Sequence, residues 1–104
     1  MLKSIRDGDR VIVRLDGELD HCCAQSVRRQ LDLLLATPAV RNLVLDFSGL
    51  SFMDSSGIAV VINALRAMAR IEGRLELVGL KAQPMKVFRA SGIDKLVAIR
   101  EAVV

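Results

Sequence analysis

Hydrophobic residues recur along the chain at two spacings, which separate the expected strands from the expected helices. Near the start, two apolar-rich runs, residues 2–6 and 10–15, flank the sequence Asp7-Gly8-Asp9. An Asp-Gly pair between such runs is typical of a β-hairpin. Residues 43–47 form a short apolar run bounded by turn residues, as expected of a buried strand. Two further runs, residues 74–78 and 96–99, are expected to complete the set of strands.

Two helices are expected on either side of the middle of the chain. The first should follow Asp20, whose carboxylate can accept hydrogen bonds from the free backbone N–H groups of a first turn. It should end before Pro38, because the residue before a proline is pushed out of helical geometry. The other should open near Pro84, in its favoured first-turn position, and end at Gly92. Apolar residues at helical spacing should face the core: Cys23, Val27, Leu31 and Leu34 in the first helix, Val87 and Phe88 in the other.

The longest helix is expected between these two, from about Ser55 to Ile71. It follows a compact connector, residues 50–53, and Gly73 is expected to end it in the left-handed conformation. The spacing of its apolar residues predicts a core-facing stripe of Ile58, Val61, Ile62, Leu65, Met68 and Ala69.

The predicted order of elements is β-β-α-β-α-β-α-β in a single domain, residues 1–104. Strands separated by helices imply crossover connections and a parallel sheet, to which the N-terminal hairpin adds one antiparallel pair. The predicted fold class is therefore α/β, with a mixed, mostly parallel β-sheet and an N-terminal hairpin, covered by about three to four helices. A chain of 104 residues can bury one hydrophobic core but not two.

Composition narrows the classes of function. Hydrophobic residues make up 52% and charged residues 26% of the chain, which excludes a disordered protein. Aromatic residues make up only 3%, so a surface that stacks nucleic-acid bases is not expected. The net charge of +3 comes from scattered basic residues rather than a run. We therefore expect no direct contact with nucleic acid.

No membrane segment is expected. The longest stretch without charge, residues 55–65, is shorter than the ~18 residues of a membrane-spanning helix. The N-terminus lacks the apolar stretch of a signal peptide. The two cysteines, Cys22 and Cys23, are adjacent, and this spacing does not suit an intramolecular disulfide. A reducing cytoplasm fits best, and a redox-sensitive Cys22 stays an alternative to a purely structural thiol.

The sequence Asp54-Ser55-Ser56-Gly57 stands between a buried strand and the longest helix. If Asp54 caps that helix, the next three residues occupy a first turn whose backbone N–H groups lack partners and whose macrodipole is positive. A phosphate on a first-turn hydroxyl would be stabilised there. Gly57 would leave the approach to Ser56 free of a neighbouring side chain. The same residues are also an ordinary capping turn, since Ser and Asp are favoured at helix starts.

Catalysis and metal binding are weaker hypotheses for the same region. A serine nucleophile would need a base and an orienting carboxylate. The candidates are Ser55 or Ser56 as nucleophile, His21 as base, and Asp20 or Asp54 as the carboxylate. The pattern G-x-S-x-G is absent, and four consecutive residues at a helix start, 20–23, cannot all be aimed at one metal ion. We expect no catalytic residue, no metal site and no cofactor.

The segment Leu43–Ile58, LVLDFSGLSFMDSSGI, closely resembles the signature of STAS domains. More narrowly, it is similar to the signature of anti-sigma factor antagonists, also called anti-anti-sigma factors. Residues 17–21, GELDH, and residues 88–93, FRASGI, match further strings of that family in order and spacing. The resemblance spans almost the whole chain and implies a STAS-like fold.

The resemblance also implies a function. In that family the second serine of the motif is phosphorylated by the cognate anti-sigma factor, a small serine kinase that uses ATP and Mg²⁺. The unphosphorylated protein binds the anti-sigma factor and frees the sigma factor; the phosphorylated form cannot, until a serine phosphatase restores it. Carried over by motif position, the phosphorylation site is Ser56, and the partner-binding residues are Asp20, Asp54, Ser55 and Gly57.

Two departures from the family pattern stand out, at Cys22-Cys23 and at the end of the chain. Residues 101–104 are expected to leave no room for the longer C-terminal helix of many relatives.

Other STAS proteins are subunits of lipid-transport ABC systems or scaffolds of stress-signalling complexes, and these form the alternative function. Others again are cytoplasmic domains of anion transporters, which the lack of a membrane span disfavours. Serine at both motif positions favours regulation by phosphorylation over the lipid-transport alternative, because lipid-transport subunits often lack a phosphorylatable residue at the second position.

Overall fold

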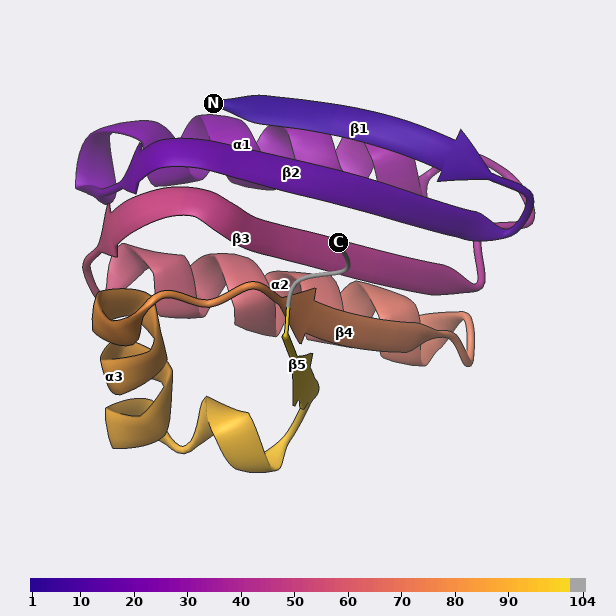
Figure 1. Ribbon diagram of the computed structural model, residues 1–104. Coiled ribbons are helices and arrows are strands. Elements are labelled where there is room, and N and C mark those ends of the chain that lie inside the picture. Colours follow the sequence, from indigo (N-terminus) through magenta and orange to yellow (C-terminus); the bar gives the residue numbers. More distant parts are fainter. Residues whose placement is uncertain (102–104) are drawn as a thin grey trace.

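The strands and helices follow the predicted order along the chain in a computed structural model, which describes residues 1–101. The elements are β1 (Leu2–Asp7), β2 (Arg10–Leu19), α1 (His21–Leu35), β3 (Asn42–Met53), α2 (Ser56–Arg70), β4 (Arg74–Val78), α3 (Ala82–Ser91), a 3-10 helix (Ile93–Lys95) and β5 (Ala98–Arg100). The strands form one sheet in the order β1-β2-β3-β4-β5 (Figure 1). β1 pairs with β2 antiparallel, and the other neighbouring strands are parallel. The predicted α/β class, with its mixed sheet and N-terminal hairpin, is confirmed.

Helices α1 and α2 pack against one face of the sheet, the far side in Figure 1. Alternate residues of the central strands, such as Val13, Leu45 and Phe47, point to this face and are fully buried. The ring of Phe47 meets that of Phe88 from α3 edge-to-face, with centroids 5.6 Å apart. The opposite face carries no helix within the described residues (Figure 1). The helices therefore cover the sheet from one side.

Strands β2 and β3 run farther than the apolar runs indicate. β3 takes in residues 50–53, so the prediction of a compact connector there was wrong. The pairing of β2 with β3 shifts register twice, between Arg14 and Asp16 and between Gly17 and Glu18. Gly17 has φ 89°, which suits such an irregularity. Because the alternation of apolar and polar residues breaks at these shifts, the pattern hides how far each strand continues.

The buried face of α2 is rotated relative to the predicted stripe. Ala69 is exposed, whereas Val60 and Ala64 are fully buried. Ile58, Ile62 and Leu65 are only partly buried against the core. The reason is that α2 packs against the sheet and against α1 together, and a hydrogen bond from Asn63 to Asp32 joins the two helices at 3.0 Å.

Glycines at the ends of α2 and α3 are needed for two different reasons, a left-handed backbone or a close approach to another segment. Gly92 ends α3 at φ 82°, as predicted. After α2, however, the left-handed residue is Glu72 at φ 55°, not Gly73. A Cβ at Gly73 would lie 2.7 Å from the carbonyl oxygen of Arg41, so glycine is needed there for close approach. The prediction of a left-handed Gly73 was therefore wrong.

The C-terminal part departs from prediction in detail. The 3-10 helix was not predicted, and β5 begins at Ala98, after an exposed Leu96. Residues 101–104 were expected to leave no room for a further helix. Of these positions, 102–104 lie outside the described residues. No helix among residues 1–101 combines the length and hydropathy needed to cross a membrane.

Candidate functional site

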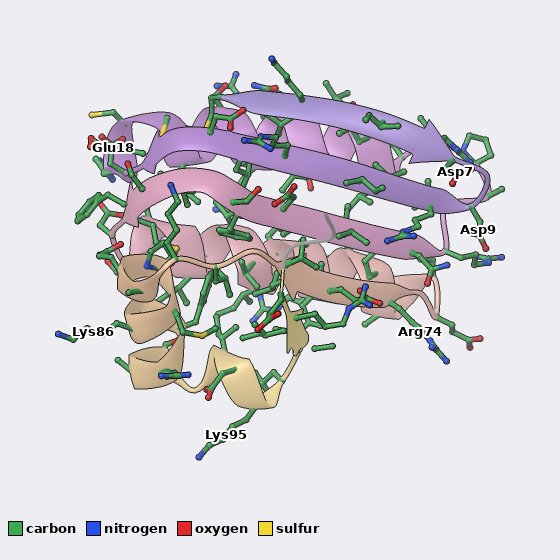
Figure 2. All side chains as sticks on the ribbon, viewed as in Figure 1. Asp7, Asp9, Glu18, Arg74, Lys86 and Lys95 are labelled. Atoms are coloured by element: carbon green, nitrogen blue, oxygen red, sulfur yellow. The ribbon has the colours of Figure 1, made fainter. Side chains whose placement is uncertain are left out.

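The carboxyl ends of β2 and β3 bring two separated segments of the sequence together. Leu19 and Met53, the last residues of these strands, are aligned partners in the sheet. The backbone N–H of Asp54 donates to the carbonyl oxygen of Leu19 at 3.2 Å. Helices α1 and α2 start immediately afterwards, at the same end of the sheet (Figure 1). Glu18 lies at this end, whereas Arg74 lies toward the other (Figure 2).

One carboxylate serves the starts of both helices. Asp54 accepts a hydrogen bond from the backbone N–H of Ser56 at 2.8 Å through Oδ1, and from that of His21 at 3.1 Å through Oδ2. The residue just before α2 is Ser55, which makes no side-chain cap hydrogen bond. The predicted capping role of Asp54 is confirmed, although the helix begins one residue later than expected.

These contacts change the acidity of Asp54. The backbone N–H of Ser56 is the largest cause that lowers the pKa of this carboxyl, and partial desolvation opposes it. The hydroxyl of Ser56 and the backbone N–H of His21 lower it further. Hydrogen bonds to a carboxylate favour its charged form, so Asp54 is an anion whose two oxygens both face backbone donors.

Asp20 caps α1, as predicted. Its Oδ1 accepts hydrogen bonds from the backbone N–H groups of Cys22 at 3.0 Å and Cys23 at 3.2 Å. Two aspartates, 20 and 54, therefore sit one residue beyond the aligned strand ends. Together they satisfy backbone donors that a helix start leaves without intrahelical partners.

The two serines of the motif differ in their surroundings. Ser55 is exposed, whereas Ser56 is half-buried as the first residue of α2. Gly57 is buried, and a Cβ there would lie 2.8 Å from the methyl carbon of Met53 and 3.3 Å from a methyl of Leu19. The glycine thus lets α2 start close against the strand ends. The prediction that it keeps the approach to Ser56 clear was wrong, because its missing side chain points to the core.

A residue that the sequence did not indicate, Gln83 of α3, positions the end of β3. Its amide accepts from the backbone N–H of Met53 and donates to the carbonyl of Met53, both at 2.9 Å. β4 ends opposite Asp46, so the later residues of β3 have no partner strand on that side. The amide completes the hydrogen bonding there in the way a neighbouring strand would. Nothing in the sequence around this glutamine indicates that it pairs with a strand end.

The other candidate groups are not arranged as a serine nucleophile with a general base beside it. In the described residues, no hydrogen bond links the imidazole of His21 to a serine hydroxyl, and Asp20 and Asp54 both face backbone donors. No group of three His, Cys, Asp or Glu side chains is placed to hold a metal ion among residues 1–101. Both cysteines are free thiols, and partial burial is the main cause that raises the pKa of Cys23.

Comparison with known proteins identifies the family of the whole chain. The sequence model of the STAS domain matches residues 2–104. The anti-sigma F factor antagonist of Lysinibacillus sphaericus is 34% identical over 85 residues, which cover 82% of this chain and 73% of that protein. The anti-sigma-B factor antagonist of Listeria monocytogenes is 26% identical over 95 residues, covering 91% of this chain and 82% of that protein.

Solved structures agree with this assignment. The Bacillus cell fate determinant SpoIIAA in its phosphorylated form superposes with a TM-score of 0.79 at 30% identity, covering 99% of this chain and 92% of that one. The five-stranded sheet with its N-terminal hairpin is thus shared with an experimentally solved relative. The chain belongs to the STAS domain family.

Proposed function

We propose that this protein is an anti-sigma factor antagonist whose activity is switched off by phosphorylation of Ser56. The observation that carries the proposal is the position of Ser56, at the first residue of α2 and half-buried beside the capping carboxylate of Asp54. The names of the two antagonist relatives and the phosphorylated form of SpoIIAA support it.

In the unphosphorylated state, the partner-binding surface consists of the strand ends and helix starts around Asp20, Asp54 and Ser55. The partner is an anti-sigma factor that is also a serine kinase. Its capture releases the sigma factor. Gly57 contributes from within, by letting α2 start against Met53. The protein itself has no catalytic residue or cofactor in this scheme and is a substrate of the kinase in the cytoplasm.

Phosphorylation transfers the γ-phosphoryl group of ATP, bound with Mg²⁺ by the partner, to Oγ of Ser56. The bond between that phosphorus and ADP breaks, a new O–P bond forms, and the hydroxyl proton passes to a base of the kinase. The helix start tolerates an anion, because the positive end of the α2 macrodipole favours negative charge. The fold is therefore kept, and a serine phosphatase reverses the change by hydrolysis.

The loss of binding follows from charge. A phosphate adds about −1.5 to −2 charges beside the carboxylate of Asp54. A partner surface built around a neutral hydroxyl has no donor for this charge, and burying it there costs several kcal/mol. Each 1.4 kcal/mol lowers affinity about tenfold.

Calorimetric titration with the cognate anti-sigma factor tests the proposal. Ser56→Ala should bind and resist phosphorylation, whereas Ser56→Asp should fold and bind at least about tenfold more weakly. Ser55→Ala is the matched control. Mass spectrometry should show that this variant is still phosphorylated at Ser56. Phosphorylation at Ser55 alone, or equal affinity of the phosphorylated and unphosphorylated proteins, would overturn the proposal.

A further inference from the structure

Beside Ser56 the surface is hollowed into a groove between α1 and α2. The groove has a volume of about 310 Å³ and is lined by His21, Ala24, Gln25, Arg28, Ser56 and Ala59. The α1 residues follow helical spacing and so share one face of that helix. The two alanines leave the space between the longer side chains open.

Four of the six residues that line this groove have polar side chains, and none of them is a carboxylate. Arg28 is exposed and makes no ion pair within residues 1–101. The nearest acidic residue along α1 at helical spacing, Asp32, already accepts a hydrogen bond from Asn63. Gln25 adds an amide donor one turn before Arg28. The groove therefore offers a free guanidinium and an amide next to the hydroxyl of Ser56.

Three acidic residues lie at this end of the molecule, and two of them accept hydrogen bonds from backbone N–H groups. Asp54 faces the backbone N–H groups of Ser56 and His21, and Asp20 faces those of Cys22 and Cys23. Glu18 belongs to the end of β2, on the same side of the molecule (Figure 2). The starts of α1 and α2 both lie here, and each helix directs the positive end of its macrodipole to this region.

We propose that this groove is a phosphate site in which Gln25 and Arg28 of α1 hold the phosphate of phosphorylated Ser56. The inference rests on the proposed function and adds where the phosphate goes: into the groove beside α1, instead of free in solvent. Arginine suits this role, because its planar fork can make two parallel hydrogen bonds to phosphate oxygens. The site also distinguishes the serines, since Ser56 lines the groove and Ser55 does not.

A consequence is that phosphorylation links α1 to α2. The phosphate would connect the first residue of α2 with the second turn of α1, near the Asp54 bridge that already joins the two helix starts. The phosphorylated protein should therefore melt at a higher temperature than the unphosphorylated one. This gain should depend on Arg28.

The test uses the full chain with phosphoserine installed at position 56 during translation, so that neither kinase nor partner is required. Phosphorus NMR titrations at low salt compare the original sequence with Arg28→Gln and with Arg29→Gln. Arg29 is exposed, adjacent in sequence and absent from the groove lining, which makes it a matched control. Circular dichroism checks that each variant is folded, and Arg28→Lys keeps the charge while removing the fork.

The second pKa of the phosphate, near 6 for a free phosphoserine, should rise by about half a unit in Arg28→Gln, because a nearby cation favours the dianion. Arg29→Gln should leave it unchanged, and Arg28→Lys should fall between. Phosphoserine at position 55 should be insensitive to Arg28→Gln. Identical titrations of Arg28→Gln and Arg29→Gln would overturn the inference.

The two proposals can fail separately. If Arg28→Gln leaves the phosphate titration unchanged while phosphorylation abolishes partner binding, the groove is not the phosphate site but the switch stands. If the titration responds to Arg28→Gln while phosphorylation leaves partner affinity unchanged, the phosphate site stands and the switch fails.

Discussion

The carboxylate of Asp54 accepts a hydrogen bond from the backbone N–H of His21, at 3.1 Å and from thirty-three residues away in the sequence. The same side chain caps the start of α2 through Ser56. A single residue of the STAS motif thus holds the starts of two helices together at the end of the sheet. The geometry of the proposed phosphorylation site depends on this bridge.

The first prediction concerns Asp54→Asn. An asparagine has one side-chain oxygen instead of two, so one of the two backbone N–H groups loses its partner, and the melting temperature should fall. Folding lowers the pKa of Asp54 below 3.8, so its stabilisation is present above that value and is lost as pH falls through the lower folded pKa. Thermal melts from about pH 2 to pH 6 should show the difference from the original protein shrinking in acid.

The control for this prediction is Asp7→Asn. Asp7 is exposed, and its side chain makes no hydrogen bond within the part of the chain that the structure describes. Its substitution should leave the acid dependence of the melting temperature unchanged. A constant difference for Asp54→Asn across the whole pH range would contradict the charged bridge.

A second prediction concerns Gln83→Ala. Loss of the amide leaves the backbone N–H of Met53 without its partner at a fully buried position. The free energy of unfolding should fall by about 1–3 kcal/mol, the cost of an unsatisfied buried polar group. Gln30→Ala, which removes an exposed glutamine bonded to Ser26, should change it by no more than about 0.5 kcal/mol in the same urea titration. Equal effects of the two substitutions would argue against the strand-like role of Gln83.

A third prediction uses the left-handed Glu72 at φ 55°. Glycine adopts this conformation without the steric cost that a side chain incurs, although it gains entropy in the unfolded chain. Glu72→Gly should therefore raise the free energy of unfolding by about 0.5–1 kcal/mol. Ala39→Gly, at φ 65°, should change stability in the same direction. A decrease for both variants would show that the turn conformations are misassigned.

A fourth prediction separates the two cysteines. Cys22 is exposed, whereas the Sγ of Cys23 lies 3.2 Å from the carbonyl oxygen of Glu18, and partial burial raises its pKa. The thiolate is the reactive form, so iodoacetamide should alkylate Cys22 faster at mildly basic pH. Peptide mass spectrometry over time measures both sites, with Cys22→Ser to isolate Cys23. Faster labelling of Cys23 would contradict its partly buried position.

Much of the fold could be predicted from local pattern. The hairpin at Asp7-Gly8-Asp9 and the cap at Asp20 depend on residues close together in the chain, whose conformational preferences are strong. The alternation of strands and helices then implied the mixed sheet. The motif Asp54-Ser55-Ser56-Gly57 was placed correctly at a helix start, because capping is a local interaction.

What the sequence by itself determined, then, is the order of elements, the core of the sheet and the place of the two serines. Only the tertiary structure decided that Asp54 reaches His21, that Gln83 completes the end of β3, and that Gly57 and Gly73 are required for close packing. The physical reason is that each of these features depends on a contact between segments far apart in the chain, which for Gly57 is the contact with Leu19. Their geometry is set by how β2, β3 and the helices pack, and no local preference for a turn, cap or strand records it.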